Sequence, residues 1–354
     1  MRWHLAVALA ATLVRTLACN PLISSDCPPD PALSASFKET FNLESKYFTA
    51  VKENGLSYTD IGLEFQIAKQ GMNPSIKSDF YIMFGKVEVV LQAAEGQGII
   101  SSFYLQSDDL DEIDIELFGG DPYEYQSNFF LKGNTATYDR GRYHHTSSSP
   151  LLNFHTYTIE WTEDQITWTC DGKLDRTLLS TNPQGFPQTP MYIMAGAWAG
   201  GDPNNQIGTI EWAGGLTDYN KGPFQMYIKS IIVSDYSSGK SYSYTDKSGT
   251  WQSIKSDGGK INGRIQEAQK EFATLQSVAA NTFSSAVSTT GGPTSGAQRT
   301  SSVSTFATGL TTLSSSTARP AASSVSSISA VNGAMQYSAS FVTSIVAVFA
   351  FLMV

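Results

Sequence analysis

The stretch "DLDEIDIELFGG" places carboxylates at three alternate positions, Glu112, Asp114 and Glu116, with apolar residues between them. Successive side chains of a β-strand point to opposite faces, so a strand here would carry all three carboxylates on one face. Like charges so close together repel one another. We therefore expect at least one raised pKa, which would keep one group protonated while a neighbour stays ionised.

Such a group suits retaining glycoside hydrolysis. In that reaction one carboxylate attacks the anomeric carbon, and a second carboxyl group protonates the leaving oxygen and later deprotonates the acceptor. Glu112 and Glu116 would have Cα atoms roughly 13 Å apart on one strand, a gap that two side chains leaning over a sugar can partly close. Asp114 lies between them, where it can orient one partner. The pattern alone also fits a strand with a solvated acidic face.

The chain between Phe37 and Tyr244 has the pattern of an all-β protein. Short runs such as "GIISSFYLQS" and "QMYIKSIIVSDY" are rich in β-branched and aromatic residues, and "TEDQ" and "DGK" are hairpin turn signals. Neither a βαβ alternation nor a sequence repeat is visible, so we predict a two-sheet antiparallel β-sandwich. The polar segment 265–281 is compatible with a short helix or a linker.

Several aromatic residues are candidates for stacking on sugar rings. Trp198 and Trp212 each stand beside a glycine-rich turn, and Tyr123 and Tyr125 follow the carboxylates closely. The alternative for each tryptophan is a place in the core.

A metal site is not expected from the adjacent residues His144 and His145. Adjacent side chains diverge on a strand, and no spaced set of carboxylates and histidines accompanies them. We predict a solvated loop there, with no metal and no cofactor.

Both ends of the chain carry targeting patterns. Residues 1–18 are typical of a secretory signal peptide, with an apolar run too short to span a bilayer. The Ser/Thr-rich residues 282–331 predict a disordered, O-glycosylated stalk. Residues 332–354, from Asn332 through a spacer to an apolar tail, predict a GPI-attachment signal, with a short membrane helix as the alternative. We therefore expect a secreted protein held at the cell surface, on the membrane or in the wall.

Charge and cysteine content further restrict the class of protein and its partners. A net charge of −9 argues against nucleic acid as a partner. Cys19 and Cys27 lie close together in a secreted chain, where a disulfide between them would close a small loop. Cys170 is left over in "QITWTCDGK", and we expect a buried, inert thiol because no histidine lies nearby in sequence to activate it.

Together these motifs resemble glycoside hydrolase family 16, in particular its fungal Crh branch. "DEIDIE" followed by "GGD" and "QSNFF" carries the resemblance, and "FGKVEVVLQAAEGQGIISSFYL" and "WAGGDPNNQIGTIEWAGG" are similar as well. The similarity covers residues 19–264, which would form the catalytic domain. It implies a concanavalin-like β-jelly roll and a cell-wall transglycosylase that cuts chitin and joins the new end to β-1,3- or β-1,6-glucan.

The resemblance also implies roles for individual residues. Glu112 would be the nucleophile, Asp114 its assistant and Glu116 the general acid/base. The residues implied to bind substrate in a sugar cleft are Gln126, Asn128, Tyr138, Arg140, Trp198 and Trp212. Three cysteines cannot supply the cysteine-rich chitin-binding module of some family members. Two alternatives stay open: a hydrolase of chitin or β-glucan that uses water as acceptor, and a catalytically idle carbohydrate-binding wall protein.

Overall fold

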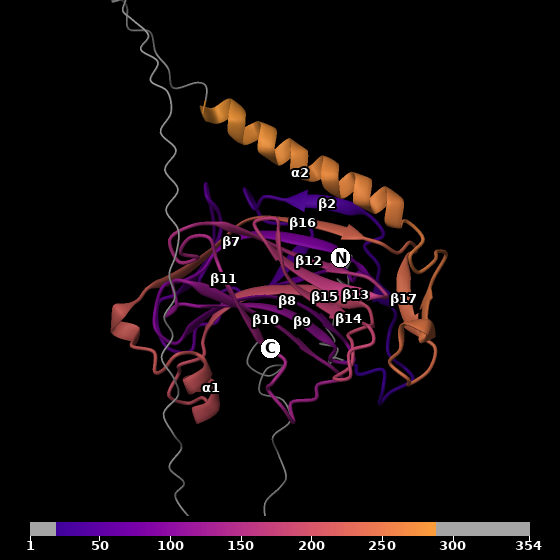
Figure 1. The fold of residues 1–354 in the computed structure, drawn as a ribbon, viewed down its shortest axis with the longest axis horizontal. Coiled ribbons are helices and arrows are strands. Elements are labelled where there is room, and N and C mark those ends of the chain that lie inside the picture. The colour runs from indigo at the N-terminus through magenta and orange to yellow at the C-terminus, as the bar shows by residue number, and fades with distance from the viewer. Residues whose placement is uncertain (1–18, 288–354) are drawn as a thin grey trace, which may run out of the picture. The chain divides into compact units, whose positions relative to one another are not determined.

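Two antiparallel β-sheets packed face to face make up most of the computed structural model, which describes residues 19–287 (Figure 1). This architecture confirms the predicted all-β sandwich. The predicted signal peptide, the stalk from residue 288 onward and the GPI signal with Asn332 lie outside the described residues.

The first sheet has seven strands in the order β11-β10-β9-β8-β15-β6-β3. Its strands are β3 (Phe48–Lys52), β6 (Ser75–Ser78), β8 (Ile99–Ser107), β9 (Glu112–Phe118), β10 (Glu124–Phe130), β11 (Arg142–His145) and β15 (Met191–Ala199). The predicted carboxylate strand is therefore β9, which is hydrogen-bonded on both sides, to β8 and to β10.

The second sheet has eight strands, in the order β14-β13-β12-β7-β16-β5-β4, with β2 paired to β16. Its strands are β2 (Ser36–Glu39), β4 (Leu56–Thr59), β5 (Gly62–Ile67), β7 (Gly85–Gln92), β12 (His155–Trp161), β13 (Gln165–Cys170), β14 (Lys173–Leu179) and β16 (Phe224–Asp235). The predicted "DGK" turn joins β13 to β14 through Asp171 and Gly172. Both residues have positive φ, as a two-residue Asp-Gly hairpin turn requires.

Smaller elements complete the described chain. A three-stranded sheet contains β1 (Asp30–Pro31), β17 (Ser241–Tyr244) and β18 (Ile254–Ser256), and the α-helices are α1 (Ile207–Trp212) and α2 (Ile265–Val287). Single 3₁₀ turns lie at Tyr219–Lys221 and Trp251–Ser253. A disulfide joins Cys19 to Cys27, as the sequence predicts. Among the described residues, no helix combines the length and the apolar character needed to span a bilayer.

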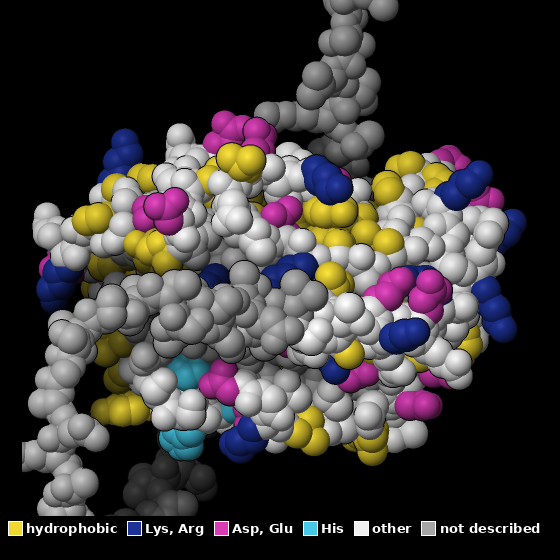
Figure 2. All heavy atoms as spheres, turned by 90° about the horizontal axis from the view of Figure 1, so that it is seen from above, with side chains coloured by type: hydrophobic (Ala, Val, Ile, Leu, Met, Phe, Trp, Pro, Cys, Tyr) yellow, Lys and Arg dark blue, Asp and Glu magenta, His cyan; other side chains and the backbone are white. Residues whose placement is uncertain are grey.

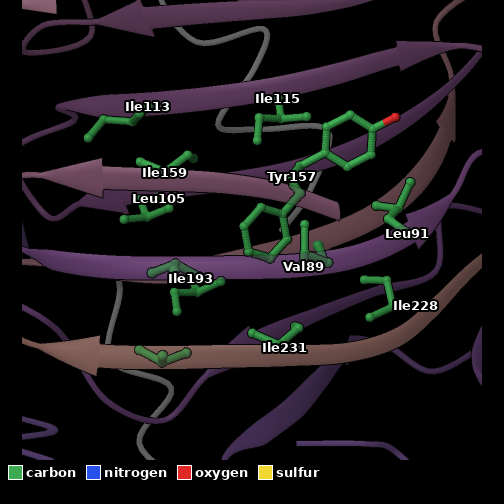
Figure 3. Close-up of a cluster of buried hydrophobic side chains, with 14 of the residues drawn as sticks. Val89, Leu91, Leu105, Ile113, Ile115, Tyr157, Ile159, Ile193, Ile228 and Ile231 are labelled. Carbon is green, nitrogen blue, oxygen red and sulfur yellow. The ribbon is translucent and has the colours of Figure 1, made fainter. Parts of the chain in front are cut away.

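Both faces of β9 are buried, each for its own reason. On the inner face, Ile113 and Ile115 lie in the cluster between the sheets, together with Tyr157 and Ile159 of β12 (Figure 3). On the outer face the three carboxylates are also at most 9 % exposed. The structure therefore excludes the alternative of a solvated acidic face. The indole nitrogen of Trp168, from the opposite sheet, donates to the backbone oxygen of Asp114 at 3.1 Å and so fixes the middle of β9 from within the core.

Helix α2 covers the outer face of the eight-stranded sheet, where it crosses β2 and β16 (Figure 1). Ala268 and Phe272 are buried there, and the Lys86 ammonium lies 5.1 Å from the centre of the Phe272 ring. The helix begins at Ile265, as the sequence allows, and continues through residues 282–287, which the sequence assigned to the stalk. Alanines just before these residues favour a helix. The high Ser/Thr content of the segment hid this preference in the sequence analysis. The carboxylates lie on the opposite side of the sandwich from this helix.

Candidate active site

The register of the seven-stranded sheet places each carboxylate beside residues of two neighbouring strands. The rows across β10, β9 and β8 are Gln126–Glu116–Ser102, Asn128–Asp114–Tyr104 and Phe130–Glu112–Gln106. Side chains directly opposite one another on one face of a sheet are close enough to interact. The sheet itself therefore supplies hydrogen-bonding neighbours to every carboxylate of the row.

A cavity of about 340 Å³ opens over this row. The residues that line it are Glu112, Asp114, Glu116, Gln126, Asn128, Phe130, Tyr138, Gly141, Tyr143, Gln206, Gly208, Thr209 and Trp212. The structure thus brings together the three predicted catalytic carboxylates and four of the six predicted substrate-binding residues. The floor is polar and the walls carry aromatic rings, a combination that suits a sugar.

The other two predicted substrate-binding residues lie behind the cavity. Trp198 is 6 % exposed and stacks on Trp212, with ring centres 6.0 Å apart. Arg140 is equally buried, with its guanidinium 6.0 Å from the centre of the Phe130 ring. Neither residue lines the cavity, and each one packs against an aromatic ring that does.

The two candidate tyrosines are also absent from the cavity. Tyr125 points into the core, is fully buried and donates its hydroxyl hydrogen to Asp175 at 2.9 Å. Tyr123 is 69 % exposed and lies outside the lining. The alternation along β10 explains the first outcome, since Tyr125 pairs with core-facing Leu117.

Sequence reasoning missed part of the wall. Tyr143 on β11 and the segment around helix α1, including Gln206 and Thr209, line the cavity. No local pattern marks α1, which has only six residues and two isoleucines. Gly141 was missed as well: a Cβ atom there would lie 2.9 Å from Cδ of Gln126, so a larger residue would displace that amide.

Glu116 is held in its protonated form by its surroundings. Burial in the cavity floor raises the pKa of Glu116 to about 8, and the charge on Glu112 adds to this effect. The Ser102 hydroxyl, which donates to Glu116 Oε2 at 2.7 Å, opposes the shift. At neutral pH this carboxyl group therefore carries a proton that it can deliver to a leaving oxygen.

Glu112 has more support for its negative charge. Burial raises the pKa of Glu112 above its usual value, and hydrogen bonds from Asp114 and from Gln106 limit this rise. The Gln106 amide donates to Glu112 Oε2 at 2.8 Å. Two donors on one carboxylate favour its ionised form, which is the form that a nucleophile needs.

Asp114 is the least solvated member of the row. It is 2 % exposed, and its Oδ1 atom has no hydrogen-bond partner among the described residues. Burial, followed by the charge on Glu112, raises the pKa of Asp114 well above its usual range. Asp114 is therefore the protonated donor in its hydrogen bond with Glu112.

The cause of these shifts differs from the sequence-based expectation. Burial, rather than repulsion between carboxylates, is the largest cause for all three groups. Repulsion adds to the shifts of Asp114 and Glu116. Glu116, with a pKa of about 8, is suited to act as an acid, and Glu112, whose charge two hydrogen bonds favour, is suited to act as a nucleophile, which is the pair that a retaining glycosidase requires.

A second hollow lies next to the cavity, beyond Glu116. This neighbouring space of about 500 Å³ shares Tyr143 and Trp212 with the first, and Phe118 lies in its lining. The Phe118 ring packs edge-on against Trp212, with centres 5.1 Å apart. An aromatic ridge therefore separates the two hollows, and a chain longer than one sugar has room to continue across it.

The histidine pair differs from the prediction of a solvated loop. His144 and His145 belong to β11, because this segment pairs with β10. His144 is half-buried and bonded to Ser127 at 2.8 Å, whereas His145 is exposed.

A separate group contains His155, Asp171 and the free cysteine Cys170. Histidine side chains gather at one edge of the face seen in Figure 2. His155 Nδ1 lies 2.6 Å from Asp171 Oδ2, and ligand atoms of all three residues lie within 4.8 Å of one another. Cys170 is buried, as predicted. None of the three lines the cavity.

Comparisons with known proteins agree with this fold. The sequence profile of glycosyl hydrolases family 16 matches residues 43–214. The chain is 61 % identical over 261 residues to the Crh-like protein CRH11 of Candida albicans, covering 73 % of this chain and 57 % of that protein. It is 55 % identical over 273 residues to Congo red hypersensitive protein 1 of Saccharomyces cerevisiae, covering 77 % and 54 %. The chain thus spans little more than half the length of these two relatives.

A solved structure extends the comparison to three dimensions. The Crh5 transglycosylase in complex with NAG superposes with a TM-score of 0.66 and 49 % identity, covering 68 % of this chain and all of that one. Fold, carboxylate row and sequence identity lead to one assignment. The chain belongs to glycosyl hydrolases family 16 and, within it, to the Crh-like proteins.

Proposed function

We propose that this chain is a retaining transglycosylase of the fungal cell wall, with Glu112 as nucleophile, Glu116 as general acid/base and Asp114 as assistant. The observation that carries the proposal is the electrostatic division within one cavity. Glu116 has a pKa of about 8, while Glu112 accepts two hydrogen bonds that favour its charge. The substrates we propose are chitin as donor and β-1,3- or β-1,6-glucan as acceptor.

The reaction has two balanced steps. In the first, Glu112 attacks the anomeric carbon, the bond to the leaving oxygen breaks, and the Glu116 proton passes to that oxygen. In the second, the Glu116 carboxylate takes the proton of an acceptor hydroxyl, the acceptor oxygen bonds to the anomeric carbon, and Glu112 leaves as a carboxylate. Asp114 stabilises Glu112 through their hydrogen bond before attack and after release.

Support for the substrates comes from the relatives and from the cavity. The Crh5 transglycosylase was solved with NAG, the monosaccharide of chitin. The second hollow beyond Glu116 offers room on the side where the acid/base stands, and a leaving or accepting chain must lie on that side. Gln126 and Asn128, directly opposite Glu116 and Asp114, are suited to bind sugar hydroxyl groups.

The test is a transfer assay with chitin oligomers as donor and fluorescent laminarin oligomers as acceptor. We expect fluorescent products whose masses contain both sugars, and none with the Glu112→Gln variant. Release of reducing ends without hybrid products would instead identify a hydrolase. Binding without turnover would identify a carbohydrate-binding wall protein.

We also propose that the protein is secreted and held at the cell surface through a GPI lipid attached at Asn332. The supporting observation is the sequence pattern of small residues, spacer and apolar tail. Deleting residues 341–354 should release the protein into the medium, as measured by immunoblots of medium and cell fractions. Retention of the truncated protein at the surface would identify another tether.

A further inference from the structure

Two hydrogen-bond chains run side by side from β15 through β8 to the carboxylates of β9. In the first, the Trp198 indole donates to Ser102 Oγ at 3.0 Å, and Ser102 donates to Glu116 at 2.7 Å. In the second, the Tyr192 hydroxyl donates to Gln106 Oε1, and Gln106 Nε2 donates to Glu112 at 2.8 Å. Each glutamate is thus reached by its own chain.

The direction of the first chain follows from the chemistry of its groups. An indole N–H can only donate, so the Ser102 oxygen must accept from Trp198. A serine hydroxyl has one hydrogen, and with its oxygen occupied by the indole that hydrogen is directed at Glu116. Trp198 therefore determines where the Ser102 hydrogen points, although Trp198 itself does not line the cavity.

The second chain has the same logic. The Tyr192 hydroxyl bonds to the carbonyl oxygen of Gln106, which turns the NH₂ group of the amide toward Glu112. The Lys77 ammonium, 3.6 Å from the centre of the Tyr192 ring, holds that ring in place. Tyr192 fixes which end of the amide faces the glutamate.

We propose that Trp198 and Tyr192 are positioning residues that act through Ser102 and Gln106, and that each one serves a single glutamate independently of the other. The proposal rests on the proposed function only where it calls the two glutamates catalytic. Neither Trp198 nor Tyr192 lines the cavity over the carboxylates, so any effect on chemistry must pass through the intermediate side chain.

The arrangement of the sheet accounts for the independence. The row that contains Met194, Tyr104 and Asp114 lies between the two hydrogen-bond chains. The Met194 side chain has no hydrogen-bond donor, so β15 starts no third chain in this row. The ionisable groups beside the two glutamates fall into three sets. Asp114, Tyr138 and Tyr143 line the cavity, whereas Tyr104 and Tyr192 do not. Arg176 acts on Asp114 from the opposite sheet, and Asp108 and Lys77 act on Tyr192.

Loss of a donor should move the two limbs of the pH–rate profile separately. A hydrogen bond donated to a carboxylate favours the ionised form. Losing that donor, or turning its hydrogen away, therefore raises the pKa of the glutamate. Trp198→Phe should therefore move the basic limb to higher pH, and Tyr192→Phe should move the acidic limb to higher pH. We expect shifts of about 0.5–1 pH unit, from the usual strength of one hydrogen bond.

The experiment compares kcat/KM from pH 4 to 10 for the wild type, Trp198→Phe, Ser102→Ala and Tyr192→Phe. Ser102→Ala should move the same limb as Trp198→Phe, and further, and it provides a second test if the tryptophan variant does not fold. The matched control is Met194→Leu on the same strand and face, which should move neither limb. A uniform loss of rate with both limbs in place would overturn the proposal.

A measurement without substrate separates this inference from the proposed function. Carboxyl ¹³C titration of glutamate-labelled protein reports both pKa values directly, with the signals assigned through Glu112→Gln and Glu116→Gln. We expect Trp198→Phe to shift only the Glu116 titration and Tyr192→Phe only that of Glu112. Joint shifts or none would overturn the two-chain arrangement, whereas a failed transfer assay with separate shifts would overturn only the proposed reaction.

Discussion

Two groups of buried carboxylates follow one another along the chain, and their surroundings differ. Asp109 and Asp111, in the turn before β9, are fully buried. Both bind the Lys132 ammonium, at 2.7 and 2.8 Å, and the Thr189 hydroxyl donates to Asp109 at 2.6 Å. We call this group the paired cluster.

The carboxylates of β9 have no such partner. Among the described residues, no lysine, arginine or histidine nitrogen lies within 4.0 Å of Glu112, Asp114 or Glu116. Their donors are neutral groups, and one oxygen of Asp114 has none. A cation beside Glu116 would lower its pKa, and less of the acid form would then remain to protonate a leaving group. Lys132 lowers the pKa of Asp111 in this way, although burial still raises that pKa to about 6.

The comparison indicates what each cluster does for the protein. A buried carboxylate with a cation and several donors ties loops together, here the β8–β9 turn, Lys132 after β10 and Thr189 before β15. Buried carboxylates without a cation cost stability, and their pKa values move into the range that chemistry uses. The four predictions below should separate these two roles.

The largest effect is expected from Glu112→Gln. It removes the nucleophile and keeps the shape, so kcat should fall by about 10⁴-fold or more while the protein stays folded. The transfer assay measures the rate, and a thermal melt checks the fold. Wild-type turnover in a folded, pure variant would contradict the assignment.

Breaking the paired cluster should lower the stability of the protein more than its catalytic rate. Lys132→Met leaves two buried aspartates without their cation, which should lower the free energy of unfolding by about 3–5 kcal/mol at neutral pH. The loss should shrink at low pH, where the aspartates can take up protons. Urea unfolding measures it, with Lys132→Arg as the control that keeps the charge. A Lys132→Met protein as stable as the wild type would contradict the structural role.

Asp114→Asn tests the middle of the unpaired row. Because Asp114 is already protonated, asparagine removes little charge, and the basic limb should stay in place. The rate should fall by about 10²-fold, the lower end for helper groups, because an amide cannot exchange a proton with Glu112 as its charge changes. A clear shift of the basic limb to lower pH would show instead that Asp114 is ionised and acts by repulsion.

The sequence was sufficient to predict how the site residues are arranged along a single strand. Alternation along β9 correctly placed Glu112, Asp114 and Glu116 on one face, and the Asp-Gly turn after Cys170 was visible because both signals are local. Local patterns record which residues share a face of a strand.

What the sequence could not supply is the register between distant strands. Ser102 and Trp198 meet across β8 and β15, far apart in the chain, and nothing near either residue marks the other. The sequence therefore predicts a role for Trp198 in substrate binding but not its hydrogen bond to Ser102. The burial of Glu116 was missed for the same reason, because the wall over it comes from α1 and β11. This burial is the largest cause of the raised pKa of Glu116, which the sequence analysis attributed to repulsion between carboxylates.

The smallest predicted effect is a gain in stability from Glu116→Gln, whereas most substitutions of buried residues lower stability. The pKa of Glu116 is about 8 in the folded protein and about 4.5 when unfolded, so between these values the folded state holds the extra proton. The stability contributed by that proton is fully present below pH 4.5 and is lost as the pH rises through 8. Glu116→Gln does not titrate, so it should match the wild type near pH 4 and become more stable at pH 9.

The full shift corresponds to about 5 kcal/mol, and we expect a smaller difference of about 1–2 kcal/mol at pH 9, because water in the cavity can solvate the charged Glu116. That corresponds to a few degrees in Tm, measurable by thermal melts from pH 4 to 9. Glu53→Gln, at an exposed position, is the matched control and should follow the wild type at every pH. Glu116→Gln less stable than the wild type at pH 9 would mean that the fold stabilises the Glu116 charge, which would contradict the raised pKa of this group.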